Sequence, residues 1–155
     1  MISPELLRHY PFFGLLNEAQ LVKVAMIAEE ESFESGAVIF REGETSNTLY
    51  FLLEGNVDLY YTFAEMQHAG IEKGIPVGEI NPGEPFGISA LVEPYVLTST
   101  ASVHRSARVI KIDALSLRKV FEKDRKLAYL FTYQAAKAAI VRLQASRVQL
   151  AAAWA

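Results

Sequence analysis

The spacing of apolar residues predicts a short helix near the start of the chain. Apolar side chains recur there at intervals of three or four residues, at Leu21, Val24, Ile27 and Ala28. This is the period of a helix with one buried face. Asn17, followed three residues later by Gln20, has the capping-box pattern of a helix start. We therefore expect an amphipathic helix that begins after Asn17.

The hydrophobic period changes to two from Phe33 onward, which predicts antiparallel strands. The alternation is clearest where the apolar Val57 and Leu59 are interleaved with the polar Asn56 and Asp58. Strand-length segments are expected at residues 38–40, 48–61, 76–80 and 103–112, with a turn at the Asn-Pro-Gly sequence of 81–83. Short strands at this spacing favour a barrel or a sandwich.

Two helices are expected after the strands. Asp113 has the position of an N-cap for a helix that ends at about Lys123. Asp124 has the same position for a helix that runs from Arg125 nearly to the C-terminus. The second helix contains neither Pro nor Gly, and its roughly 30 residues would span about 45 Å. It is longer than a small barrel needs for cover.

The long helix carries two apolar seams. The first seam, which we expect to form the contact between two copies of the chain, comprises Leu127, Phe131, Ala138, Val141, Ala145 and Val148. The second comprises Ala136, Ile140, Leu143, Leu150 and Trp154. One seam can dock on the barrel while the other meets a partner, and a symmetric pair of chains is the commonest arrangement. The alternative that both seams are intramolecular stays open.

Length and composition fit one domain over residues 1–155, with 51% hydrophobic and 21% charged residues. We expect a helical part at 1–32, a β part at 33–112 and C-terminal helices at 113–155. The chain has no cysteine, which excludes disulfides, thiolate metal sites and cysteine nucleophiles. No apolar stretch approaches the roughly 18 residues of a membrane span, and the first residues lack a signal-peptide pattern. We expect a cytoplasmic protein without membrane contact.

The net charge of −3 conceals an asymmetry along the chain. Residues 1–104 contain 4 Lys and Arg against 15 Asp and Glu, which gives −11, and residues 105–155 contain 11 against 3, which gives +8. We expect the two parts to attract each other. The basic residues alternate with apolar ones at helical spacing, so an acid-facing or solvated helix is favoured over a nucleic-acid footprint. The acidic run at 29–31 is interpreted as a solvated helix end.

Gly36, Gly43 and Gly55 have the spacing G-x6-G-x11-G. With strands followed by helices, this pattern resembles the cyclic-nucleotide-binding domain shared by catabolite-activator-type transcription factors, kinase regulatory subunits and gated channels. The resemblance covers about residues 10–150. It implies a mainly β fold, an antiparallel β-roll or jelly roll with a short N-terminal helix and a long C-terminal helix. The glycines would then shape tight turns of positive φ rather than touch a ligand.

The segment FGISALVEPYVLTSTA, residues 86–101, resembles that family's phosphate-binding cassette, F-G-E-[LIV]-A-L followed by R-[ST]-A. The resemblance implies ligand-binding positions at Phe86, Gly87, Ile88, Ser89, Ala90, Leu91, Ser99, Thr100 and Ala101. In the family the glutamate binds the ribose and the arginine pairs with the phosphate, but here Ile88 and Ser99 stand in their places. Residues 85–103 contain no Lys or Arg. Because an unpaired buried charge costs about 3–5 kcal/mol, we expect ordinary affinity for cyclic AMP or cyclic GMP to be absent.

Three interpretations of this degenerate cassette stay open. The pocket accepts a less polar ligand on a lining of Ile88, Ala90, Leu91, Val92, Val96 and Leu97; it binds a cyclic nucleotide in an altered mode; or its own side chains close it. His104 and Arg105 are the nearest replacements for the missing charge. Some relatives hold haem in such a pocket, but His9, His68 and His104 are scattered along this chain, and no ligand pair is evident.

No catalytic or metal-binding motif is present in the sequence, so we expect neither an enzyme nor a metal site. No helix-turn-helix follows the long helix, so specific DNA binding is not expected. The sequence therefore predicts a stand-alone regulatory or sensor module that signals through residues 125–154 as a homodimer, with a partner protein as a further receiver. The alternative is the sensor domain of a transcription regulator, separated from its DNA-binding part, that binds a cyclic nucleotide or an apolar ligand such as haem.

Overall fold

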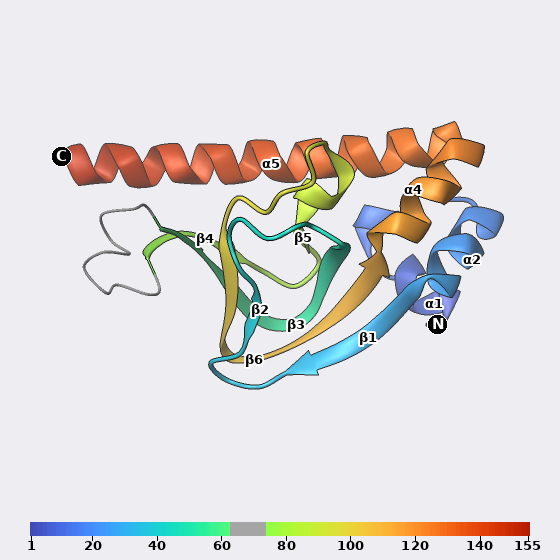
Figure 1. The fold of residues 1–155 in the computed structure, drawn as a ribbon, viewed down its shortest axis with the longest axis horizontal. Helices are drawn as coiled ribbons and strands as arrows, with labels where there is room; N and C mark the ends of the chain where they lie inside the picture. Colours follow the sequence, from blue (N-terminus) through green and yellow to red (C-terminus); the bar gives the residue numbers. More distant parts are fainter. Residues whose placement is uncertain (63–73) are drawn as a thin grey trace.

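A computed structural model describes residues 1–62 and 74–155 of the chain. Figure 1 shows a curved sheet with short helices at one end and one long helix across it. The helices are α1 (Pro4–Arg8), α2 (Glu18–Met26), α4 (Ala114–Lys123) and α5 (Arg125–Trp154), with 3-10 turns η1 (Pro11–Phe13) and η2 (Ile88–Leu91). The strands are β1 (Ala28–Phe33), β2 (Val38–Phe40), β3 (Thr48–Tyr61), β4 (Ile75–Ile80), β5 (Pro85–Phe86) and β6 (Thr100–Asp113).

The strands form an antiparallel sheet in which the two longest, β3 and β6, lie at the centre. Within the described residues the order is β1-β6-β3-β4, while β2 pairs with β6 and β5 pairs with β3. The β3–β6 ladder extends from Thr48 opposite Asp113 to Tyr60 opposite Thr100. This confirms the expected fold class, a mainly β roll flanked by a short N-terminal and a long C-terminal helix.

The acidic run at 29–31 was wrongly interpreted as a helix end, because α2 stops at Met26 and Ala28 already opens β1. β1 pairs with β6, and this pairing brings acidic side chains beside basic ones. Glu30 forms a salt bridge with Arg108, and Glu31 with Lys111. The strand is therefore held by backbone pairing and opposite charge rather than by a hydrophobic alternation. These bridges also confirm the predicted attraction between the acidic and basic parts.

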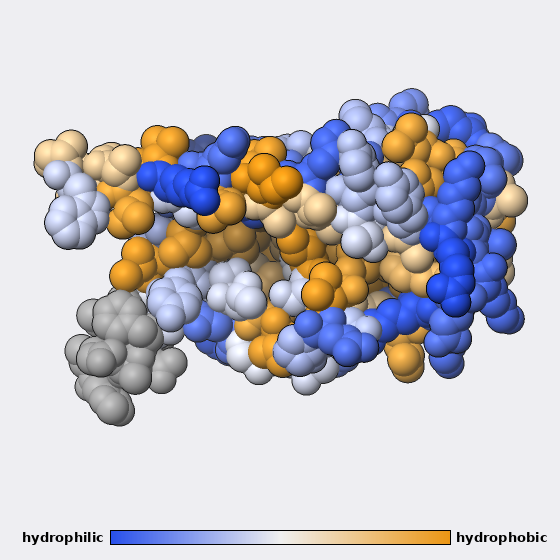
Figure 2. Space-filling model, turned by 90° about the horizontal axis from the view of Figure 1, so that it is seen from above, coloured by the Kyte–Doolittle hydropathy of each residue, from blue (hydrophilic) through white to orange (hydrophobic). Residues whose placement is uncertain are grey.

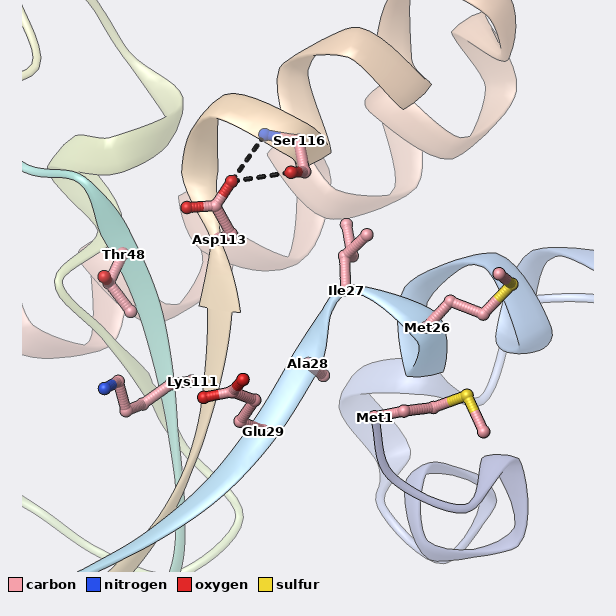
Figure 3. Close-up of a pocket in the computed structure, with 9 residues that line it drawn as sticks. All are labelled: Met1, Met26, Ile27, Ala28, Glu29, Thr48, Lys111, Asp113 and Ser116. Carbon is pink, nitrogen blue, oxygen red and sulfur yellow. Dashed lines mark hydrogen bonds between the residues drawn. The ribbon is translucent and has the colours of Figure 1, made fainter.

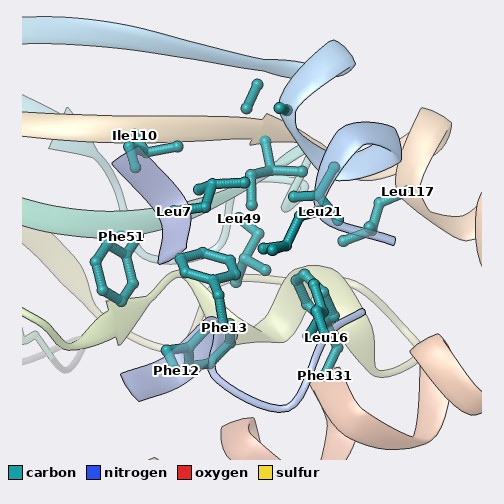
Figure 4. Close-up of a cluster of buried hydrophobic side chains, with 14 of the residues drawn as sticks. Leu7, Phe12, Phe13, Leu16, Leu21, Leu49, Phe51, Ile110, Leu117 and Phe131 are labelled. Atoms are coloured by element: carbon teal, nitrogen blue, oxygen red, sulfur yellow. The ribbon is translucent and has the colours of Figure 1, made fainter. Parts of the chain in front are cut away.

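Among the described residues, one of two clusters of buried side chains joins the helices to the sheet. Its centre is aromatic: the ring centroids of Phe13 and Phe51 are 5.1 Å apart, and those of Phe12 and Phe131 are 5.5 Å apart. Edge-on and tilted pairs of this kind add to the stabilisation that burial provides. Figure 4 shows Phe131 of α5 among side chains from the N-terminal helices and the strands. Burial of Phe131 anchors the first turns of α5 against the roll.

The second cluster fills the inside of the roll and includes Phe40, Leu52, Phe86 and Val109. Tyr50, which packs against it, stacks on Phe86 with ring centroids 5.0 Å apart. Burial raises the pKa of the Tyr50 hydroxyl. The cluster includes Phe86, Leu97 and Ala101, so both ends of the cassette segment are anchored in the core of the roll.

The three predicted helix starts are confirmed in detail. Asn17 and Gln20 form a reciprocal capping box with two 2.9 Å hydrogen bonds. Asp113 accepts hydrogen bonds from the Ser116 hydroxyl and backbone N–H, which hold the pKa of its carboxyl below the usual value. Asp124 accepts from the Leu127 N–H at 3.0 Å. These caps satisfy backbone donors that a helix start leaves free.

α5 runs unbroken for 30 residues, but its two seams are placed differently from the expectation. Leu127 and Phe131 of the predicted dimer seam are 0% and 1% exposed in the core of their own chain. The buried face continues through Ala135, and only Val141 and Val148 of the large residues in that seam are exposed. Apolar side chains exposed along α5 are visible in Figure 2. The first residues of this seam, Leu127 and Phe131, therefore pack within their own chain and are not available to a second copy.

The second seam, Ala136, Ile140, Leu143, Leu150 and Trp154, is exposed throughout. Tyr129, Tyr133 and Arg147, which the sequence analysis did not include, are also exposed and extend it into a series with alternating steps of four and three residues: Tyr129, Tyr133, Ala136, Ile140, Leu143, Arg147, Leu150 and Trp154. At 3.6 residues per turn, these positions lie on roughly the opposite side of the helix from Phe131. We call this set the outer stripe.

We predict that Gly55→Ala destabilises the protein by about 3 kcal/mol or more. A Cβ at Gly55 would lie 1.9 Å from the Ser106 carbonyl oxygen, and φ is +88°. Gly36→Ala is the matched control, because φ is +84° and, apart from Gly36 and its two chain neighbours, no described residue lies within 4 Å of the new Cβ. Its expected cost is about 1–2 kcal/mol, from the left-handed backbone alone. Urea unfolding measures both, and equal costs would contradict a steric role for the close approach.

Candidate functional site

A hollow of about 210 Å³ lies between the cassette segment and α5. We call it the cassette pocket. The roll contributes Phe40, Leu59, Phe86, Gly87, Ile88, Ser89, Leu97, Thr98 and Ser99 to its lining, and α5 contributes Ala139 and Arg142. Figure 2 shows the molecule hollowed beside the helix, with apolar side chains in the recess. The lining is mainly apolar, with three hydroxyl groups and one guanidinium.

The structure divides the predicted cassette residues into two groups. Phe86, Gly87, Ile88, Ser89 and Ser99 line the pocket. The other four predicted residues serve the fold: Ala90 and Leu91 pack in the helix-to-sheet core, Ala101 is buried in the roll, and the Thr100 hydroxyl accepts a hydrogen bond from the Glu42 N–H at 3.0 Å. Of the suggested apolar lining, Val92 and Val96 are instead exposed.

The start of the cassette depends on the backbone at Gly87. Its φ is +64°, and it precedes the 3-10 turn η2. A Cβ there would lie 3.1 Å from the Tyr50 ring and 3.3 Å from the Thr48 carbonyl oxygen. Gly87 therefore lets the chain turn sharply from β5 into η2 directly above β3, which aims the following residues at the pocket.

The nearest basic residues in sequence do not line the pocket. His104 and Arg105 are exposed on β6 and line a separate surface hollow with Asn56, Asp58 and Glu79. Arg142 of α5 lies in the pocket instead, and its Nη2 donates to the Pro85 carbonyl. Arg142 is the one charged side chain among the described residues of the lining.

Sequence reasoning missed Arg142 because it treated the helix as two apolar seams. The buried face of α5 passes from Leu127 and Phe131 to Ala135, and the same three- and four-residue steps continue to Ala138 and Arg142. A lone basic residue at an inward position of an amphipathic helix was the available signal.

Arg118 of α4 is a second arginine that the sequence reasoning missed. Its Nε and Nη2 donate to the Ala90 carbonyl at 3.1 and 2.9 Å, and its Nη2 also donates to the Ser46 carbonyl at 3.3 Å. Its guanidinium carbon lies 3.6 Å from the centre of the Tyr95 ring. Tyr95 follows η2 in a left-handed conformation with φ of +58°, and its carbonyl accepts from the Ser46 N–H at 2.7 Å. Arg118 therefore ties both sides of the cassette to α4.

A larger hollow of about 390 Å³ lies at the other end of the sheet, between the start of β1 and the end of β6. Figure 3 shows that Asp113, one of its polar residues, is already engaged, because it accepts two hydrogen bonds from Ser116. Lys111 forms a salt bridge with Glu31 at 2.9 Å. None of the predicted cassette residues lies in this hollow. It is therefore not the candidate ligand site.

The described residues offer no support for a metal or a haem site. No group of three His, Asp or Glu residues in residues 1–62 and 74–155 is arranged to hold a metal ion. His9 and His104 lie outside the cassette pocket, and His68 is outside the described residues. A volume of about 210 Å³ is also below the about 300–1,000 Å³ of pockets for drug-sized ligands. In the part of the chain that the structure describes, no helix is long and apolar enough to cross a bilayer.

The comparisons with known proteins assign the family. The sequence model of the cyclic nucleotide-binding domain matches residues 30–124, and the chain belongs to this family. A solved structure of a Geobacter metallireducens protein that carries the name of a cyclic nucleotide-binding protein is 38% identical, with a TM-score of 0.80. The match covers 92% of this chain and 99% of that one. The family and the fold are those of regulatory domains rather than of enzymes.

Matches at lower identity cover only part of longer proteins. The regulatory domain of Toxoplasma gondii PKA, solved with cAMP, is 21% identical with a TM-score of 0.69, and the match covers 86% of this chain and 48% of that one. A cyclic nucleotide-gated potassium channel of Mesorhizobium japonicum is 24% identical over 82% of this chain. The chain spans only 32% of that channel's length, so the resemblance concerns the domain alone.

We predict that Arg118→Gln destabilises the protein by about 2–3 kcal/mol, because buried carbonyls lose charged hydrogen-bond donors. Lys119→Gln removes the same charge from an exposed neighbour on α4 and is expected to cost less than about 0.5 kcal/mol. Thermal unfolding measures both variants, with about 2–4 °C of Tm per kcal/mol for a chain of this size. Equal Tm values for the two variants would show that Arg118 does not hold the cassette.

Proposed function

We propose that the chain is a regulatory sensor module in which a ligand in the cassette pocket changes the packing of α5. The observation that carries the proposal is that α5 lines the pocket with Ala139 and Arg142 while it exposes the outer stripe on its other side. A ligand shifts a conformational equilibrium only through contacts that differ between the two states. Residues of α5 in the pocket lining can provide such contacts.

The pocket chemistry argues against ordinary affinity for cyclic AMP and cyclic GMP. Ile88 and Ser99 line the pocket at the positions where the family places its glutamate and arginine. An isoleucine cannot accept a hydrogen bond from a ribose hydroxyl, and a serine carries no charge for the phosphate. The small volume of the hollow further favours either a compact ligand or one that displaces α5.

The output is proposed to be a homodimer formed by the outer stripe of α5. A repeat of alternating four and three residues is the pattern of a two-helix coiled coil, and Ala136 permits close approach. The described residues of the same chain leave this stripe exposed, with Trp154 at 84%. The stripe replaces the first seam as the proposed interface, because Leu127 and Phe131 are occupied within the chain. A partner protein and a cytoplasmic location stay predictions from the sequence, and no catalytic reaction is proposed.

We predict that 1 mM cyclic AMP or cyclic GMP raises the Tm by less than about 4 °C. A ligand with Kd of about 1 µM would stabilise by about 4 kcal/mol at that concentration, which corresponds to about 8–16 °C here. Most of this stabilisation is expected to be missing, because the cassette has no arginine to pair with the phosphate of the nucleotide. Melting of the full chain with each nucleotide, at matched ionic strength, measures the shift. A rise of about 8 °C or more with either one would contradict the reduced affinity.

We predict that the wild-type chain is a dimer at tens of micromolar and that the double variant Leu143→Glu, Leu150→Glu is a monomer. The added carboxylates would face each other across the stripe and would have to be desolvated. The double variant Gln144→Glu, Gln149→Glu adds the same charge at exposed neighbours outside the stripe and should stay dimeric. Light scattering after size exclusion measures the mass. A monomeric wild-type chain would refute the dimer.

A further inference from the structure

The cassette pocket contains a positive charge that comes from the helix rather than from the cassette. The lining from the roll is apolar or hydroxylic, and Arg142 of α5 is its one charged residue among those described. In the described parts of the chain, no salt bridge involves Arg142. The charge therefore lies in the hollow without a carboxylate partner.

The guanidinium of Arg142 has unused donor capacity. Nη2 donates to the Pro85 carbonyl, whereas Nε is buried and has no hydrogen-bond partner in residues 1–62 and 74–155. No other side-chain nitrogen or oxygen in those residues is in that condition. Burial lowers the pKa of Arg142, and the Glu84 carboxylate only partly offsets this effect. Glu84 is itself engaged, because its Oε1 accepts from the Asn81 N–H at 2.6 Å.

A buried donor without a partner is uncommon in folded proteins, and a bound ion is one physical reason for such a group. The guanidinium presents several N–H donors in one plane, which suits the oxygens of a phosphate group. Ser89, Thr98 and Ser99 line the same hollow and can donate O–H hydrogen bonds to further oxygens. The donor set in the pocket therefore fits a phosphate.

We propose that Arg142 is the cationic partner of a phosphate-bearing ligand in the cassette pocket, in place of the absent cassette arginine. This inference rests on the proposed sensor function and deepens it. Because Arg142 belongs to α5, the phosphate would bind the roll and the output helix at once. The phosphate would compete with the Pro85 carbonyl for the guanidinium, so binding would change how α5 is held on the roll.

The test uses the full chain labelled with ¹⁵N and titrated separately with sodium phosphate, cyclic AMP and cyclic GMP at constant ionic strength. We expect a saturable shift of the Arg142 Nε–H signal with at least one of these probes. A response to inorganic phosphate identifies the free anion as sufficient, whereas a response to the nucleotides alone shows that the base or ribose also contributes. No saturable binding of any of the three would overturn the inference.

Arg142→Gln should weaken the effective probe by about tenfold or more, followed through the Ser99 amide signal. Arg142→Lys should recover part of the affinity, because a lysine keeps the charge but loses the planar donor set. Lys137→Gln removes one charge from an exposed position five residues before Arg142 on α5 and should stay within about twofold of wild type. Equal weakening by Arg142→Gln and Lys137→Gln would reduce the effect to general electrostatics and overturn the inference.

The outcomes separate this inference from the sensor function. If the affinity for the probe is the same in Arg142→Gln as in the wild type, the proposed role of the arginine is overturned. That result leaves the proposed dimer and the ligand site in the pocket unaffected. Binding that depends on Arg142 in a chain that is monomeric supports the phosphate site and refutes the dimer output.

Discussion

The pairing of β3 with β6 is the constraint on which the rest of the structure depends. One ladder runs from Thr48 opposite Asp113 to Tyr60 opposite Thr100, so it fixes both ends of β6 at once. At one end β6 follows directly from Ser99 in the pocket; at the other, Asp113 caps α4 and starts the helical part. β3 also pairs with β5, which places Phe86 over Tyr50. A slip of one residue in this ladder would turn buried side chains outward and would displace the cassette and the helices together.

The β3–β6 pairing also explains why so much of the fold could be predicted. Both strands are long and contain apolar residues at period two, and the starts of α2, α4 and α5 have local signals in Asn17, Asp113 and Asp124. β1 could not be found this way, because Glu29 to Glu31 show no such alternation. The strand is held partly by basic side chains more than 70 residues away in sequence, such as Arg108, which donates a hydrogen bond to Glu30. Sequence patterns reveal elements whose caps and hydrophobic alternation lie within the element itself. Pairing between charges that are far apart in sequence appears only in the structure.

The candidate site was predictable to a similar extent. The cassette resemblance located Phe86 to Ser89 and Ser99 in the pocket lining, because these residues form one short segment. Arg118 and Arg142 lie on helices far along the chain, and their positions in space depend on how α4 and α5 dock. The sequence distinguishes the two seams of α5, but it does not tell which of them is buried against the roll and which is exposed. Only the packing of Phe131 against Phe12 and Phe13 decides which seam is buried.

The place of the positive charge has a consequence for regulation. A cassette arginine would belong to the roll, and its pairing with a phosphate would leave the helix to respond through weaker contacts. When the arginine belongs to α5, the strongest polar contact of the ligand is made with the helix itself. The free energy of binding is then directly linked to the position of the helix. Linkage is reciprocal, and anything that holds α5 in the bound position must raise the affinity for the ligand by the same factor.

Arg142 and the outer stripe lie on roughly opposite sides of α5, so a second copy of the chain could act on the pocket only by moving or fixing the whole helix. An unbroken helix of 30 residues without Pro or Gly is stiff enough to transmit such a movement.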